Sequence, residues 1–248
     1  MTPSTHLLSR SFLRCGSLLA LAAAAWVAGG CAECTQVILG KGDLSNFRTP
    51  TGTWQPTADV RLNTADPKRF DLVPGSGAIV NGAEGRTTDI LTTAEYGDVR
   101  VSYEFCIPKA SNSGVYFMGR YEVQILDSYG VAQPKHSDCG GIYERWADGK
   151  GFEGTPPRVN ASRPPGEWQT AEVVFRAPRF DAGGRKVENA RFKRVTLNGV
   201  EIHENVEVTG PTRSAHYSDE KPYGPLMIQG DHGPVAVRKL KVTPLHLP

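Results

Sequence analysis

The sequence has little of what builds helices, membrane spans or charged surfaces. After residue 35 almost no segment repeats apolar residues at helical spacing, and the longest apolar run, 15–28, is too short to span a bilayer comfortably. Arg10 and Arg14 account for two of the 28 Lys and Arg residues, which leaves 26 against 26 Asp and Glu after residue 30. A neutral surface has no electrostatic attraction for nucleic acid or anionic lipid, so we expect neither as a direct partner.

The beginning of the chain has the order of an exported precursor. A basic start, an apolar run and the small residues of 28–30 come before Cys31, which predicts a lipoprotein-type signal peptide over 1–30. We expect lipidation at Cys31, a tether over 31–36 and a folded domain over 37–248; cleavage and release without a lipid is the alternative. The predicted location is the periplasm of a bacterium, with membrane contact only through the lipid anchor.

Cysteine is scarce, and Cys/His clusters of the kind that bind metals are missing from the sequence. Besides Cys15 in the signal peptide and Cys31, only Cys34, Cys106 and Cys139 are left. In an oxidising compartment we expect a Cys106–Cys139 disulfide, with Cys34 free on the tether. We predict no cofactor, and the sequence leaves a divalent metal open.

Short strands separated by turns fill the rest of the chain. Glycine (27) and proline (18) are spread along it, and apolar and polar residues alternate over 99–106. The other expected strands are a central one over 168–175, a hairpin over 191–203 that turns at Asn198-Gly199, one over 226–228, a bulged last strand over 235–242, and one or two edge strands within 44–74. This pattern predicts an all-β fold, an antiparallel β-sandwich.

One segment, 112–130, carries most of the chemistry. It predicts two strands joined at Met118-Gly119, with Arg120, Glu122 and Gln124 on one face of the second strand. Three polar groups on one face of an apolar strand suit a groove for a polar ligand, although Glu122 on a plain solvated surface is the alternative.

The spacing Glu122-x-Gln124-x-x-Asp127 resembles the Glu-x-Asp-x-x-Glu strand of laminarinase- and lichenase-like glycosidases. A bulge before Asp127 would be needed to bring all three side chains to one side. Gln124 in place of the middle acid weakens the case for an ordinary retaining glycosidase.

Further candidate site residues lie in loops. Gln229, Asp231 and His232 surround a glycine-flanked turn, where the imidazole can exchange a proton near neutral pH; a turn whose side chains only cap backbone groups is the alternative. The remaining candidates for substrate binding are Asn112 and Ser113 in a turn, and the aromatic residues Tyr143 and Trp146 as stacking surfaces for a sugar. Turn formation and core packing are the respective alternatives.

Several of these motifs occur together in one order. They are 112–130, Cys139-Gly140-Gly141-Ile142-Tyr143, Asn160 to Thr170, Ala177-Pro178-Arg179-Phe180-Asp181, His203 to Glu207, Gly210-Pro211-Thr212, and Gly224-Pro225-Leu226 with Gln229 and Asp231-His232-Gly233. With these motifs in this order, the chain resembles the bacterial 3-keto-disaccharide hydrolase domain over about residues 37–245. The resemblance implies a concanavalin A-like jelly roll with a carbohydrate groove.

The resemblance also implies a reaction, namely 1,2-elimination from a sugar that is already oxidised at C3, followed by hydration. The protein would then act downstream of a sugar 3-dehydrogenase. Our hypothesis makes Glu122 or Asp127 the base, Arg120 or Gln124 the donor to the enolate oxygen, and His232 the acid. The other readings are a lectin-like binding module, an ordinary retaining glycosidase and a surface-attached structural domain.

Overall fold

The computed structural model describes residue 1, residues 34–82 and residues 84–248. Residues 2–30 of the predicted signal peptide and residues 31–33 of the predicted tether, Cys31 among them, lie outside the described residues. Within the described part every regular element is a β-strand, and the strands pair antiparallel. No helix there is long and apolar enough to cross a membrane.

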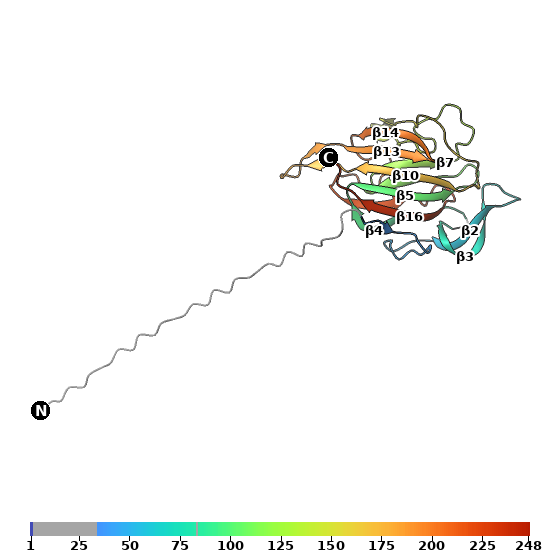
Figure 1. Ribbon diagram of the computed structural model, residues 1–248, viewed down its shortest axis with the longest axis horizontal. Helices are drawn as coiled ribbons and strands as arrows, with labels where there is room; N and C mark the ends of the chain where they lie inside the picture. Colours follow the sequence, from blue (N-terminus) through green and yellow to red (C-terminus); the bar gives the residue numbers. More distant parts are fainter. Residues whose placement is uncertain (2–33, 83) are drawn as a thin grey trace. The chain divides into compact units, whose positions relative to one another are not determined.

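Two sheets form the sandwich, as predicted (Figure 1). The larger sheet has the order β14-β13-β10-β5-β16-β3-β2, with β1 also paired to β16. Its strands are β1 (Gln36–Val37), β2 (Gln55–Leu62), β3 (Phe70–Val80), β5 (Val99–Cys106), β10 (Gln169–Arg176), β13 (Ala190–Leu197), β14 (Val200–Val208) and β16 (Ala236–Pro244).

The smaller sheet has the order β4-β15-β6-β7. Its strands are β4 (Ile90–Tyr96), β6 (Asn112–Phe117), β7 (Tyr121–Leu126) and β15 (Gly224–Ile228). Two separate pairs complete the fold, formed by β8 (Arg145–Ala147) with β9 (Lys150–Phe152) and by β11 (Arg179–Phe180) with β12 (Lys186–Glu188).

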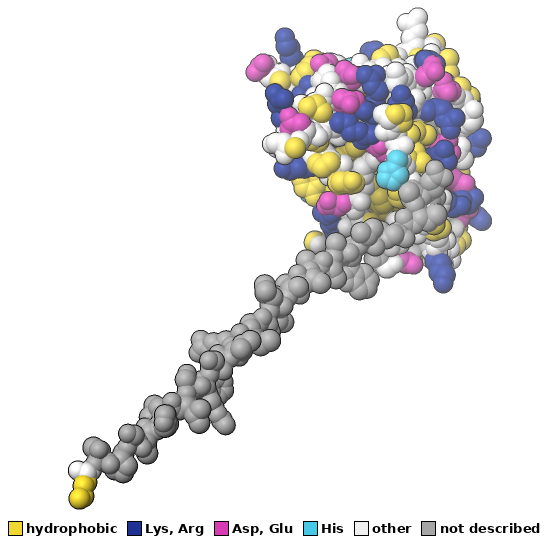
Figure 2. All heavy atoms as spheres, turned by 60° about the vertical axis from the view of Figure 1, so that its left-hand side comes forward, with side chains coloured by type: hydrophobic (Ala, Val, Ile, Leu, Met, Phe, Trp, Pro, Cys, Tyr) yellow, Lys and Arg dark blue, Asp and Glu magenta, His cyan; other side chains and the backbone are white. Residues whose placement is uncertain are grey.

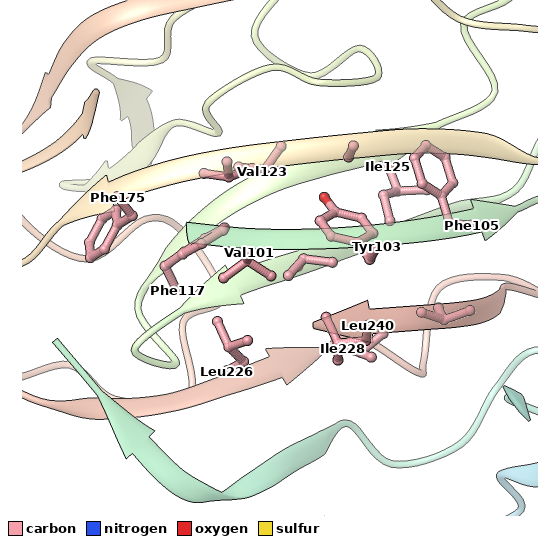
Figure 3. Close-up of a cluster of buried hydrophobic side chains, with 14 of the residues drawn as sticks. Val101, Tyr103, Phe105, Phe117, Val123, Ile125, Phe175, Leu226, Ile228 and Leu240 are labelled. Atoms are coloured by element: carbon pink, nitrogen blue, oxygen red, sulfur yellow. The ribbon is translucent and has the colours of Figure 1, made fainter. Parts of the chain in front are cut away.

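The core lies between the two sheets (Figure 3). Val101, Tyr103 and Phe105 of β5 are buried because alternate residues of a strand point to the same face. Val123 and Ile125 of β7 meet them from the smaller sheet. Burial of this apolar surface is the main stabilising contribution to the sandwich.

The predicted turns and bulge are confirmed at the level of the backbone. Asn198 and Gly199 both have positive φ (52° and 81°), as a type I′ turn requires, and so do Met118 and Gly119 (58° and 64°). In β16 the register shifts between Arg238 and Lys241, which is the predicted bulge.

The predicted Cys106–Cys139 disulfide is wrong, since both cysteines are free. Phe105 faces the core, so Cys106 points to the outer face of the larger sheet, where it packs with Val80 and Ala236. Cys139 instead belongs to the core between the sheets. Burial raises the pKa of Cys106 to about 12 and that of Cys139 to about 11, so both thiols stay protonated at neutral pH.

The surface carries mixed charges. In the view of Figure 2, Lys and Arg side chains are interspersed with Asp and Glu, as the equal counts of the two kinds lead one to expect. The face in this view has no extended patch of one sign that would attract a polyanion.

Candidate active site

The polar side chains of β7 face away from the core and line a pocket. In the β6–β7 hairpin Tyr116 pairs with Glu122, and Gly114 pairs with Gln124. Val123 and Ile125 lie in the core (Figure 3), so Glu122 and Gln124, which alternate with them along the strand, point to the opposite face of the smaller sheet. The pocket there has a volume of about 260 Å³. Its lining residues are Asn112, Tyr116, Glu122, Gln124, Tyr143, Arg213, Ser214, Gln229 and His232.

Three loops supply the walls of this Glu122 pocket. Tyr143 is held beside β7 because its amide donates to the carbonyl of Glu122 at 3.2 Å. On the other side, the amide of Glu122 donates to the hydroxyl of Thr212 at 3.1 Å, which places the loop that continues to Arg213 and Ser214. Gln229 and His232 come from the segment that follows β15. The loops thus surround a floor made by β6 and β7.

Glu122 is the carboxylic acid in the lining of the pocket, and its pKa is strongly raised. Its side chain is almost fully buried, and the hydroxyl of Tyr116 bonds its carboxylate. Burial raises the pKa of Glu122 to about 8, with Asp89 and Asp231 as further negative neighbours. Gly114 makes this position possible, because a Cβ there would collide with the Glu122 carboxylate. A carboxyl group with a pKa near the working pH is suited to proton transfer.

Three buried oxygens at this pocket have no hydrogen-bond partner among the described residues. They are Oδ1 of Asn112, Oε2 of Glu122 and Oε1 of Gln124. An unpartnered buried acceptor costs about 1–3 kcal/mol, so such groups are normally completed by water, an ion or a ligand. A ligand rich in hydroxyl groups offers the donors that these oxygens lack.

His232 reaches the pocket from a loop that is firmly held. Its Nδ1 contacts Oδ1 of Asp231, and its side chain is about half exposed. Asn81, which is fully buried, fixes this loop by donating to the carbonyls of Gly230 (3.0 Å) and Gly233 (2.8 Å) and by accepting from the amide of Val235 (2.8 Å).

Asp89 adds a fourth bond to the same loop, since its carboxylate accepts the amide of Gly230 at 2.9 Å. Burial raises the pKa of Asp89, and the negative charge of Asp231 adds to this rise. Neither Asn81 nor Asp89 was identified from the sequence, because neither belongs to a motif and their partners lie more than 140 residues away.

Arg120 is not part of the pocket, contrary to our expectation. It lies in the turn before β7, and its buried guanidinium donates to the carbonyl of Met118 at 2.7 Å and to Oδ1 of Asp219 at 2.7 Å. The ring of Tyr217 lies 4.7 Å from it. Arg120 therefore fastens the loop around Asp219 to the hairpin, and its charge is already balanced.

Ser113 and Asp127 are also placed elsewhere. Ser113 follows Asn112 in β6, so its side chain points to the face of the strand opposite the pocket. Its hydroxyl donates to the carbonyl of Gln229 at 2.8 Å. The pairing of β6 with β7 is regular, so the bulge that Asp127 needed is absent from this hairpin. The carboxylate of Asp127 accepts the amide of Ala110 at 2.9 Å instead. Asp231 does not line the pocket, but it contacts Nδ1 of His232 and its charge adds to the raised pKa of Glu122.

The cation at the pocket is Arg213, which the sequence did not single out. Its amide donates to the carbonyl of Glu144 at 2.7 Å, and its guanidinium lies 3.2 Å from Oε1 of Glu144. The available signal was its position directly after the Gly210-Pro211-Thr212 motif. Trp146 does not line the Glu122 pocket; its indole lies 3.9 Å from the Arg213 guanidinium, on the side of a neighbouring hollow.

A larger hollow of about 800 Å³ lies apart from these residues, lined among others by Tyr96, Arg179 and Tyr223. Its main cation is already paired, since Arg179 bonds both oxygens of Asp98 (2.8 and 2.7 Å). None of its lining residues, all of them described, has a buried polar atom without a partner. The Glu122 pocket is therefore the better candidate for chemistry, despite its smaller volume.

No group of three or more His, Cys, Asp or Glu side chains in the described part of the chain is arranged to hold a metal ion. The donors around the Glu122 pocket are mostly amides, phenols and a guanidinium. Such groups bind an organic ligand through hydrogen bonds.

The β-sandwich holds a pocket of hydrogen-bonding groups, and comparison with known proteins places it among carbohydrate-active domains of the hydrolase or lyase kind. The chain belongs to the family described as the 3-keto-alpha-glucoside-1,2-lyase-like domain, whose sequence profile matches residues 35–243. This confirms the resemblance drawn from the motifs. Among curated proteins none matches the chain.

Solved structures show the same fold. One Parabacteroides distasonis protein, titled a "putative glycosyl hydrolase", is 24% identical with a TM-score of 0.63, over 85% of this chain and 84% of that one. A second protein of the same organism and description is 18% identical with a TM-score of 0.56, over 86% of this chain and 100% of that one. At this level of identity the likeness extends to the fold alone.

Proposed function

We propose that this protein cleaves glycosides of 3-keto-sugars by 1,2-elimination and then hydrates the product. The observation that carries the proposal is a buried carboxyl group, Glu122, whose pKa is raised to about 8 in a pocket with three unpartnered acceptor oxygens. Family membership supports the same chemistry. Each part of the reaction has a matching group in the pocket.

The first step removes a proton from carbon. A ketone at C3 acidifies the hydrogen on C2, and the Glu122 carboxylate takes that proton while the electrons of the C2–H bond form the enolate. The negative charge then develops on the C3 oxygen, where Arg213 and the amide nitrogen of Gln124 supply donors. A base whose pKa is about 8 is stronger than an ordinary carboxylate, which favours this step.

The second step expels the leaving group. The C1–O bond breaks as the C1–C2 double bond forms, and protonated His232 gives its proton to the departing oxygen. Asp231 stabilises the charged imidazole through its contact with Nδ1. Water then adds across the double bond: neutral His232 takes one proton from the water as its oxygen bonds to C1, and Glu122 returns its proton to C2. The net reaction is hydrolysis of the glycoside.

An ordinary retaining glycosidase fits this pocket poorly. That mechanism uses two carboxyl groups about 5 Å apart, one as nucleophile and one as acid/base. Glu122 is the only carboxylate among the residues that line the pocket, since Asp127 bonds the amide of Ala110 instead. An elimination needs a single carboxylate, and the pocket provides one.

The test uses a 3-keto disaccharide of glucose and the matching unoxidised disaccharide, in D₂O and in H₂O. We expect release of 3-keto-glucose from the oxidised substrate alone, with deuterium at C2 of the product when the solvent is D₂O. The released sugar, incubated in D₂O without protein, controls for spontaneous exchange. Glu122→Gln should lose the activity by at least about a hundredfold and still bind the substrate.

Three results would contradict the proposal. Equal cleavage of the unoxidised disaccharide indicates a conventional glycosidase. A product without deuterium, together with no rate effect when the C2 hydrogen of the substrate is replaced by deuterium, indicates direct displacement at C1. Binding of the 3-keto disaccharide by calorimetry with no product from the wild-type protein indicates a binding module that lacks catalysis.

A further inference from the structure

A second hollow adjoins the Glu122 pocket. It has a volume of about 480 Å³ and is lined by Arg145, Trp146, Pro211, Thr212, Arg213, Ser214, Ala215 and Ser218. Arg213 and Ser214 line both spaces. A ligand that fills the Glu122 pocket can therefore extend past these two residues into the hollow.

Trp146 gives this second hollow, called the Trp146 hollow below, its apolar surface. The residue lies on the short β8–β9 hairpin, opposite Gly151, so no cross-strand side chain covers it. Nearly half of the tryptophan surface (47%) is exposed. The Arg213 guanidinium, 3.9 Å from the indole, fixes the orientation of the ring. A large aromatic ring held in place and left open to solvent is typical of a binding surface.

The charges of the hollow are balanced. Arg213 is paired with Glu144 at 3.2 Å, and Arg145 is paired with Glu153 at 3.3 Å. The ligand is therefore not selected by charge. Nε of Arg145 is buried and has no acceptor within the described structure.

We propose that the Trp146 hollow is the subsite for the leaving group of the glycoside and takes an uncharged ring that stacks on Trp146. This inference rests on the proposed function, because it names the part of the substrate beyond the bond that is cleaved. The shared chemistry is the flat apolar face of a ring, whether of a second sugar or of an aryl group. A leaving group without a ring gains nothing from this surface.

The test compares three 3-keto-glucosides, whose leaving groups are glucose, a phenol and methanol. For Trp146→Ala we expect kcat/KM to fall roughly three- to tenfold with the two ring-bearing substrates and to stay within about twofold with the methyl glycoside. The glucose and phenol arms distinguish the two kinds of ring. Tyr129→Ala, which truncates another exposed aromatic side chain, should leave all three substrates unchanged.

Trp146→Phe keeps a ring and should restore most of the loss, and equal melting temperatures will show that the variants are folded. An equal fall with all three substrates, or no fall with either ring-bearing one, overturns the subsite.

Binding separates this inference from the proposed function. If the wild-type protein turns over none of the substrates, the proposed reaction is wrong. Weaker binding of the 3-keto disaccharide to Trp146→Ala in a Glu122→Gln background still supports the subsite, and unchanged binding removes it.

Discussion

The raised pKa of Glu122 predicts that this residue destabilises the fold as the pH rises. Between pH 4.5 and about 8 the unfolded chain has lost the Glu122 proton, while the folded protein still holds it. Raising the pH through this range therefore favours the unfolded chain. At about 1.4 kcal/mol per pKa unit, the rise from 4.5 to about 8 corresponds to a loss of about 5 kcal/mol at pH 9.

The substitution Glu122→Gln removes the titration and keeps the shape of the side chain. We expect the free energy of unfolding of the variant, measured by urea titration, to exceed that of the wild-type protein by a margin that grows by about 4 kcal/mol between pH 5 and pH 9. The pH dependence of this difference is the relevant quantity, because it cancels the titration of all other groups.

Glu104→Gln is the matched control. Arg238 and Lys239 lower the pKa of Glu104, so its contribution is present above the ordinary pKa of 4.5 and is lost only as the pH falls through the lowered value. That variant should be less stable than the wild-type protein by an amount that stays constant from pH 5 to pH 9. A difference for Glu122→Gln that is equally flat would refute the reasoning about its burial.

The remaining predictions concern activity on a 3-keto-glucoside. Because the proposed reaction needs Glu122 ionised and His232 protonated at the same time, the pH profile of kcat/KM should be bell-shaped with one limb near pH 8; a plateau that continues above pH 8 would show that no second group has to hold a proton. Gly114→Ala should lower kcat about a hundredfold, because the new Cβ displaces the Glu122 carboxylate, and unchanged kinetics would show that the close approach is unimportant.

The periodicity of the strands made much of the site predictable. A period of two places Glu122 and Gln124 on one face, and this holds wherever the strand is regular. The same rule places Cys106 opposite to Phe105, so the alternation over 99–106 already argued against a disulfide with a core cysteine. The prediction for Arg120 was wrong because this residue lies in the turn before β7, where side chains no longer alternate between the two faces of a strand.

What the sequence could not supply depends on distant contacts. Arg213 reaches the pocket because it bonds Glu144, 69 residues earlier, and Arg120 is withdrawn from it by Asp219, 99 residues later. Neither partner follows from local spacing. Asp127 required a bulge, and a bulge depends on the pairing of two strands as well as on the strand that contains it.

The fastening of residues 209–220 to the β6–β7 hairpin limits how this site can be transplanted. Thr212 donates its amide to the carbonyl of Arg120 at 2.9 Å, and Glu220 accepts from the hydroxyl of Tyr121 at 2.6 Å. The segment that carries Arg213 is thus held by Arg120 and Tyr121, the two residues that directly precede Glu122. A chimera that grafts the hairpin onto another jelly roll must bring this segment along, or it will receive the carboxylate without the guanidinium.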